Sequence, residues 1–248
     1  MGFQLITETL EDTKKATFAV LVPSPQPELK GFPTPAGTCF FISEDGYFIS
    51  ARHVFEALQT AEKVILTKPE VFPSPHVSNI EIVQDWKNYD LILLKADFDK
   101  NKNKTYFQNK RGFDFIEPEF EIIPEGKEAY SFGYPLPSFQ VKADSKIMIG
   151  VHYFSPRTTS FIVSSHFDII GPVMGQNFPT HYAIDKALNY GNSGGPIIIQ
   201  DSGKVISVCS RFQPVDIPQN AEFSVGVPSL YGITSSLKNI ENELKEYI

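Results

Sequence analysis

The sequence is poor in cysteine, which limits how the chain can be stabilised. It has two cysteines in 248 residues, Cys39 and Cys209. Small secreted domains often carry several disulfides that compensate for a small hydrophobic core. We therefore expect two reduced thiols in the core. A single Cys39–Cys209 disulfide is the alternative, although their spacing does not indicate one.

Positive charge and long apolar runs are scarce as well. The formal net charge is −7, the sequence pI is about 5.3, and no basic stripe is present, so we expect no nucleic-acid partner. No apolar run approaches the roughly 18 to 20 residues that span a membrane. Residues 1–15 are polar and lack the apolar core of a signal peptide. We therefore expect no membrane partner and a cytoplasmic location.

Patterns that bind metals or cofactors are also missing from the sequence. No cysteine and histidine cluster has zinc spacing, and no glycine-rich loop is built to hold a phosphate. Residues 97–108 begin like a calcium-binding loop, but Lys102 stands where that loop needs glycine and Gln108 where it needs glutamate. We therefore expect no metal and no cofactor.

The chain is rich in proline (19), glycine (16) and phenylalanine (21), and short apolar runs alternate with turn residues. This pattern favours an all-β fold with many short strands. In the first half we expect strands at 16–22, 37–43, 47–50, 63–67, 79–84 and 90–96. In the second half we expect strands at 127–133, 146–152, 160–164, 180–184, 196–200, 204–210 and 222–227.

A polar stretch at 97–118 separates two halves, which we place at residues 1–112 and 113–234. Helices are expected at both ends of the chain. Residues 4–15 suit a short helix, and residues 235–248 suit a C-terminal α-helix with one apolar face, formed by Leu237, Ile240, Leu244 and Ile248.

The most informative stretch runs from Asn189 to Pro196 and reads NYGNSGGP. Glycines on both sides of Ser193 allow backbone turns that side chains forbid. Such a turn can direct the amides of Gly191 and Ser193 into one small space, as in an oxyanion hole. A serine hydroxyl needs a base to act as a nucleophile at neutral pH, so the motif requires a histidine and an orienting carboxylate.

Two residues elsewhere meet this requirement. His53 follows an expected strand that ends at Ser50, and Asp90 opens the apolar strand 90–96, which would shield its carboxylate. Taken singly, each of the five histidines is more often structural, and an aspartate at a strand end is common. The order His, Asp, Ser is nevertheless one known arrangement of a catalytic triad.

Six segments carry a resemblance to a known family. They read GTCFFI (37–42), GYFISARHV (46–54), DLILLK (90–95), SFGYP (131–135), DKALNYGNSGGP (185–196) and VGVPS (225–229). The chain resembles trypsin-like serine peptidases of the chymotrypsin fold, closest to the HtrA-type bacterial branch. The resemblance implies two packed six-stranded antiparallel β-barrels, the first carrying His53 and Asp90 and the second carrying Ser193.

The resemblance also implies roles for individual residues. His53 would be the general base and acid, Asp90 its orienting carboxylate and Ser193 the nucleophile, with Gly191 and Ser193 supplying the oxyanion-hole amides. The partner would be a peptide or protein substrate, bound along the edge of the strand near Ser210. We expect a neutral pocket that favours apolar side chains, lined by Ala187, Leu188, Ser207, Val208, Cys209, Ser210 and Arg211.

The sequence departs from the family pattern in several ways. Asn192 stands where digestive relatives carry aspartate, so activation through an ion pair with a new N-terminus is not expected. Arg52 precedes the histidine, either as a solvated residue or as a contact for acidic substrate side chains. Neither a PDZ module nor a leader is expected in the chain. The alternative to an active endopeptidase is a latent or non-proteolytic peptide-binding module on the same scaffold.

Overall fold

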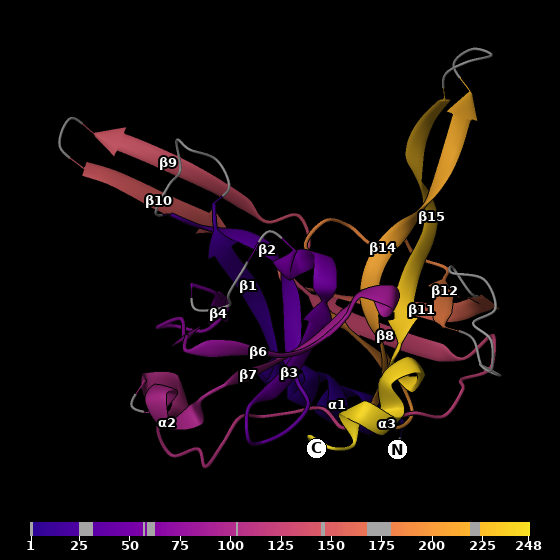
Figure 1. The fold of residues 1–248 in the computed structure, drawn as a ribbon, viewed down its shortest axis with the longest axis horizontal. Coiled ribbons are helices and arrows are strands. Elements are labelled where there is room, and N and C mark those ends of the chain that lie inside the picture. The colour runs from indigo at the N-terminus through magenta and orange to yellow at the C-terminus, as the bar shows by residue number, and fades with distance from the viewer. Residues whose placement is uncertain are drawn as a thin grey trace.

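The computed structural model describes residues 2–24, 32–56, 58, 63–102, 104–144, 147–167, 180–218 and 224–248. Two β-sheets dominate the molecule (Figure 1). The first half forms a curled antiparallel sheet of seven strands in the order β5-β4-β1-β2-β3-β7-β6. Its strands are β1 (Thr17–Pro23), β2 (Pro33–Phe41), β3 (Tyr47–Ala51), β4 (Ile65–Thr67), β5 (His76–Val77), β6 (Ile80–Trp86) and β7 (Leu91–Ala96).

The second half forms a closed six-stranded barrel in the order β11-β12-β15-β14-β13-β8. Its strands are β8 (Glu128–Gly133), β11 (Arg157–Phe167), β12 (His181–Ile184), β13 (Pro196–Ile199), β14 (Val205–Pro218) and β15 (Ser224–Ser236). The all-β, chymotrypsin-like fold is therefore confirmed. The first sheet differs in detail, because it has seven strands and remains a half-barrel in the described part of the chain.

Two hairpins are longer than the sequence pattern indicates. Strands β9 (Ser138–Asp144) and β10 (Ile147–Tyr153) form a separate two-stranded ribbon, and β14 and β15 extend together beyond the barrel (Figure 1). The expected strand at 222–227 begins at Ser224 in the structure. Its first two positions lie outside the described residues, as does residue 146 of the expected strand at 146–152.

Helices are few and short apart from the first. They are α1 (Gly2–Ala16), α2 (Phe98–Asn101) and α3 (Glu241–Leu244), with 3₁₀ turns η2 (Arg52–Phe55), η3 (Lys87–Tyr89), η4 (Thr105–Phe107) and η5 (Leu237–Ile240). The C-terminal helix is shorter than expected because β15 continues to Ser236, the 3₁₀ turn η5 follows it, and α3 ends at Leu244. Three of the four residues of its predicted apolar face, Leu237, Ile240 and Leu244, are buried, whereas Ile248 is exposed.

Both chain ends pack against the half that they do not belong to. Leu237, Ile240 and Leu244 join the core of the first sheet. The Trp86 side chain donates a hydrogen bond to Glu243 in α3 at 2.6 Å. In the opposite direction, the hydroxyls of Thr13 in α1 and Tyr130 in β8 lie 3.0 Å apart. The two halves therefore pack against each other through both ends of the chain.

The core holds both cysteines. Cys39 and Cys209 are buried and free, which confirms the expectation of two core thiols. Burial raises the pKa of both thiols. Among the described residues, no helix is both long and apolar enough to cross a membrane.

Candidate active site

His53 and Asp90 meet where two paired strands end. Strands β3 and β7 pair with Ala51 opposite Leu91, so the residues just beyond Ala51 lie beside the residue just before Leu91. Asp90 adopts the left-handed conformation (φ 54°, ψ 38°) that turns the chain from η3 into β7. Its carboxylate accepts from the His53 backbone amide at 3.0 Å and from the imidazole Nδ1 at 2.8 Å. This pairing leaves Nε2 of His53 as the ring nitrogen available for chemistry.

The carboxylate of Asp90 is held in its charged form. Burial disfavours that charge and by itself raises the pKa of Asp90, but hydrogen bonds from His53 and Ser210 outweigh it, so the pKa lies below its usual value. The Ser210 hydroxyl donates to Oδ2 of Asp90 at 2.5 Å. The sequence placed Ser210 only in the substrate pocket, and its contact with Asp90 needs the two sheets to meet.

The turn that leads into Ser193 has a defined geometry. The Asn192 amide donates to the carbonyl of Asn189 at 3.0 Å, and Gly191, at the third position of this turn, has φ +93°. A positive φ at that position alone is the mark of a type II turn. The carbonyl of Tyr190 accepts from the Leu136 amide at 2.6 Å. Because the peptide bond is trans, the Gly191 N–H points the opposite way, away from Leu136.

Thr38 holds the turn through two hydrogen bonds. The Thr38 hydroxyl donates to the carbonyl of Gly191 at 2.7 Å, and its amide donates to the carbonyl of Ser193 at 2.8 Å. A Cβ added at Gly191 would lie 2.3 Å from the carbonyl oxygen of Tyr134, and one at Gly194 would lie 2.0 Å from that of Thr38. These close approaches explain why the motif needs glycine on both sides of the serine.

The Ser193 side chain lies beside the same cluster. Its hydroxyl donates to the carbonyl of Ser210 at 3.0 Å. The Ser210 carbonyl thus contacts Ser193, the Ser210 hydroxyl contacts Asp90, and Asp90 in turn contacts His53. The three residues that the sequence singled out are therefore connected through Ser210, and Thr38 holds the turn at Gly191.

The expected pocket residues separate into two groups. Leu188, Ser207, Val208 and Cys209 are buried, and their side chains pack in the interior. Ala187 is half-buried. Ser210 contacts the site directly, and Arg211 is exposed beside it. Strand β14 pairs with β13 up to Val208 and then leaves it, so the edge at Ser210 lies next to Ser193.

A cavity of about 360 Å³ opens beside His53 and Asp90. It is lined by Arg52, His53, Glu56, Lys87, Asn88, Tyr89, Asp90, His181 and Arg211. The Arg52 guanidinium is already paired with Asp85 at 2.9 Å and Glu56 at 3.2 Å. Within the described residues, Lys87 and Arg211 take part in no ion pair, so the unpaired charge around this cavity is positive.

Three of the other four histidines have hydrogen bonds of their own, and His181 also lines the cavity beside His53. His152 donates through Nε2 to the carbonyl of Pro33 at 2.7 Å, and His166 to that of Ile123 at 2.6 Å. His181 is buried in β12 with the Thr180 hydroxyl 2.7 Å from its Nδ1. In the part of the chain that the structure describes, no group of three or more His, Cys, Asp or Glu side chains is arranged to hold a metal ion.

Comparison with known proteins agrees with this geometry. Residues 37–208 match the trypsin-like peptidase domain, so the chain belongs to the trypsin-like peptidase family. A relative from Sinorhizobium fredii (strain NBRC 101917 / NGR234), described as uncharacterized protein y4bJ, is 25% identical over 239 residues. That alignment covers 93% of this chain but 32% of y4bJ, so the chain spans about a third of the length of this relative.

Solved structures of an HtrA-type protease share the fold. AlgW with a decapeptide matches with a TM-score of 0.63 at 14% identity, covering 97% of this chain and 66% of AlgW. A variant of AlgW, also with a decapeptide, matches with a TM-score of 0.60 at 14% identity and covers 98% of this chain and 67% of that one. At this identity the likeness establishes the fold alone.

Proposed function

We propose that the protein is a serine endopeptidase that uses His53, Asp90 and Ser193. The observation that carries the proposal is the hydrogen-bonded cluster in which Asp90 holds His53 through Nδ1 and Ser210 contacts both Asp90 and Ser193. Ionised Asp90 fixes the tautomer of His53 in which Nε2 is the base. It also stabilises the imidazolium that forms when His53 takes a proton.

The reaction follows from these positions. Ser193 Oγ breaks its hydrogen bond to the Ser210 carbonyl, gives its proton to Nε2 of His53 and attacks the scissile carbonyl. The oxyanion is stabilised by the amides of Gly191 and Ser193. His53 then returns the proton to the leaving amine as the C–N bond breaks. Water takes the place of the amine, gives a proton to His53 and attacks the acyl carbonyl, and Ser193 leaves with that proton. The type II turn at Gly191 supports an oxyanion hole that is formed at rest.

The charge around the cavity beside His53 extends the proposal to substrate preference. A peptide that adds as a strand to the edge of β14 at Ser210 would run past Arg211. With Lys87 on the other side, the cavity favours an acidic side chain near the scissile bond. We propose that the primary pocket, beside Ala187, accepts apolar side chains, because Ala187 carries no charge.

The alternative is a latent peptide-binding module on a peptidase scaffold. The same AlgW structures, which hold a decapeptide, support peptide binding in either case. The resting hydrogen bond from Ser193 to Ser210, in place of one to His53, is the observation that keeps this alternative open.

A fluorophosphonate probe separates the two functions. An active enzyme labels at Ser193, Ser193→Ala abolishes the labelling, and a peptide library shows defined cleavage products. A wild-type protein that neither labels nor cleaves, yet binds library peptides, would support the binding module and refute the endopeptidase.

A further inference from the structure

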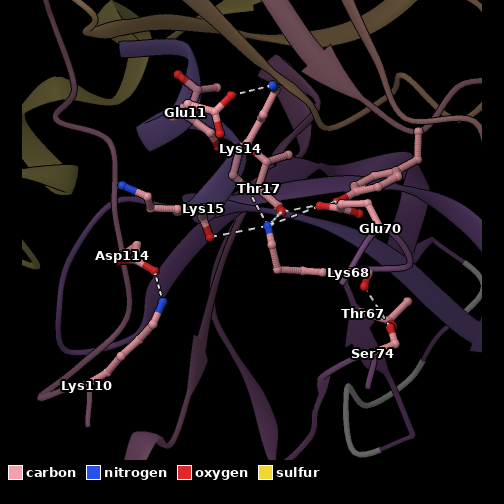
Figure 2. Close-up of polar contacts among 12 residues, drawn as sticks. Glu11, Lys14, Lys15, Thr17, Thr67, Lys68, Glu70, Ser74, Lys110 and Asp114 are labelled. Atoms are coloured by element: carbon pink, nitrogen blue, oxygen red, sulfur yellow. Dashed lines mark hydrogen bonds and ion pairs between the residues drawn. The ribbon is translucent and has the colours of Figure 1, made fainter. Parts of the chain in front are cut away.

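A buried ammonium group anchors the end of the N-terminal helix. Lys68, which follows β4, is 2% exposed. Its Nζ donates to the main-chain carbonyls of Lys14, Lys15 (3.4 Å) and Thr17 (2.6 Å) (Figure 2). The last carbonyls of a helix have no partner within it, and a cation there is favourable. Lys68 therefore caps α1 from a distant part of the chain.

The same ammonium connects the helix to the second half of the molecule. Its Nζ lies 3.6 Å from the Glu70 carboxylate. Both oxygens of that carboxylate accept from the Tyr134 hydroxyl at 3.1 Å. Figure 2 shows Lys68 and Glu70 in this network. Tyr134, which directly follows β8, is fully buried. Burial lowers the pKa of Lys68 to about 8, against the opposing effect of Glu70, so the group is charged at neutral pH.

The backbone of residues 134–137 contacts the turn at Gly191. The carbonyl oxygen of Tyr134 and the ring of Pro137 would lie 2.3 and 2.7 Å from a Cβ at Gly191. The Leu136 amide holds the Tyr190 carbonyl at 2.6 Å. The Tyr134 amide donates to the Thr38 hydroxyl at 3.3 Å, and that hydroxyl in turn donates to the Gly191 carbonyl.

We propose that Tyr134 is a positioning residue for the oxyanion hole, held in place by Glu70 and Lys68 and through them by the capped end of α1. The proposal rests on the endopeptidase function. Its physical basis is that segment 134–137 holds the central peptide of the Tyr190–Gly191 turn in the type II orientation. If Tyr134 moves, the turn loses the contacts that separate this orientation from the type I alternative, in which the Gly191 N–H points elsewhere.

The chain offers a matched control for this proposal. Tyr130 lies in β8, shortly before Tyr134 in the chain, is also buried, and its hydroxyl contacts α1 through Thr13 at 3.0 Å. Tyr130→Phe and Tyr134→Phe each remove one buried hydroxyl and its hydrogen bonds near α1. Only Tyr134 continues into the segment that contacts the oxyanion turn.

The test compares the rate constant of fluorophosphonate labelling for these two variants. A misplacement of about 1 Å at an active site costs up to about 10²-fold in rate. Because Tyr134→Phe keeps the ring, we expect a loss of about tenfold, whereas Tyr130→Phe stays within about twofold of wild type. A peptide boronate, which forms a tetrahedral adduct, should lose affinity in parallel. Peptide binding to the Ser193→Ala protein should be unchanged by adding Tyr134→Phe.

A second variant covers the case in which Tyr134→Phe fails to fold. Glu70→Gln acts on a side chain that is 29% exposed and weakens the same anchor. It should reduce labelling by a smaller factor without unfolding the protein. Equal labelling rates in wild type, Tyr134→Phe and Glu70→Gln would overturn the positioning role and leave the endopeptidase intact. A wild-type protein that does not label at all refutes the proposed function itself.

Discussion

Gly191→Ala tests whether the oxyanion hole depends on the type II turn. The new Cβ would lie 2.3 Å from the carbonyl oxygen of Tyr134 and 2.7 Å from the ring of Pro137. Neither neighbour is the free end of a flexible side chain, so the turn itself must change. A left-handed conformation also costs a non-glycine residue about 1–2 kcal/mol. Both effects favour rotation of the Tyr190–Gly191 peptide toward the type I form.

The expected cost follows from the loss of one oxyanion donor. Removing such a donor lowers kcat by about 10²–10³, equivalent to about 2.7–4 kcal/mol of transition-state stabilisation. The KM value should change little, because the substrate carbonyl carries little charge before attack. Steady-state kinetics on a cleavable library peptide, together with the labelling rate, measure both quantities.

Gly126→Ala is the matched control. Gly126 also has a positive φ (+83°), but a Cβ there would have nothing within 4 Å. Gly126→Ala therefore introduces the backbone strain without a steric clash, and Gly126 lies in a turn outside the site. Gly126→Ala should lose about 1–2 kcal/mol of stability from the left-handed conformation and keep its activity, whereas Gly191→Ala should lose activity. A Gly191→Ala enzyme within about threefold of wild-type kcat would refute the turn argument.

Two further predictions concern the charges at the site. The folded-state pKa of Asp90 is depressed, so its stabilising contribution is present above the unfolded pKa of about 3.9 and is lost as pH falls through the folded value. Ser210→Ala removes one of the bonds that depress it. We therefore expect acid unfolding at higher pH by circular dichroism, and an unchanged midpoint would contradict the role of Ser210. Exposed ion pairs contribute about 0.2–1 kcal/mol each. Lys87→Glu with Arg211→Glu should thus reduce kcat/KM for an acidic peptide by roughly tenfold relative to its amide analogue. Lys186→Glu, outside the cavity, should leave that ratio unchanged.

Much of the fold is readable from local patterns. The buried strands β1, β3 and β7 follow from their apolar runs, the sequence also indicates the helix α1, and the free thiols follow from the small number of cysteines. The ribbon β9–β10 is harder to predict from the sequence, because its first strand follows the proline-containing segment 134–137, which has the pattern of a loop. The sequence also predicts too long a C-terminal helix. Part of the reason is that β15 pairs with β14 and extends into residues that have a helical period.

The site residues also divide into those that the sequence singles out and those that only the structure reveals. Ser193, Gly191, His53 and Asp90 stand out in the sequence because each is embedded in a motif whose residue types the chemistry requires. The sequence places Ser210 in the substrate pocket and Thr38 and Tyr134 within shared motifs, but it assigns none of them a contact with the other site residues. Their importance comes from partners far away in the chain, such as the bond from Thr38 to Gly191.

The sequence by itself therefore determined the family and the all-β class, and it singled out Ser193, His53 and Asp90 as the candidates for nucleophile, base and orienting carboxylate. It could do so because glycine-dependent turns and strand-end positions are local properties. Only the tertiary structure decided which way the Gly191 amide turns, which hydroxyls hold Asp90 and Gly191, and that Lys68 links α1 to Tyr134. These are contacts between residues that lie far apart in the sequence, and their energies arise only when burial removes the competing water.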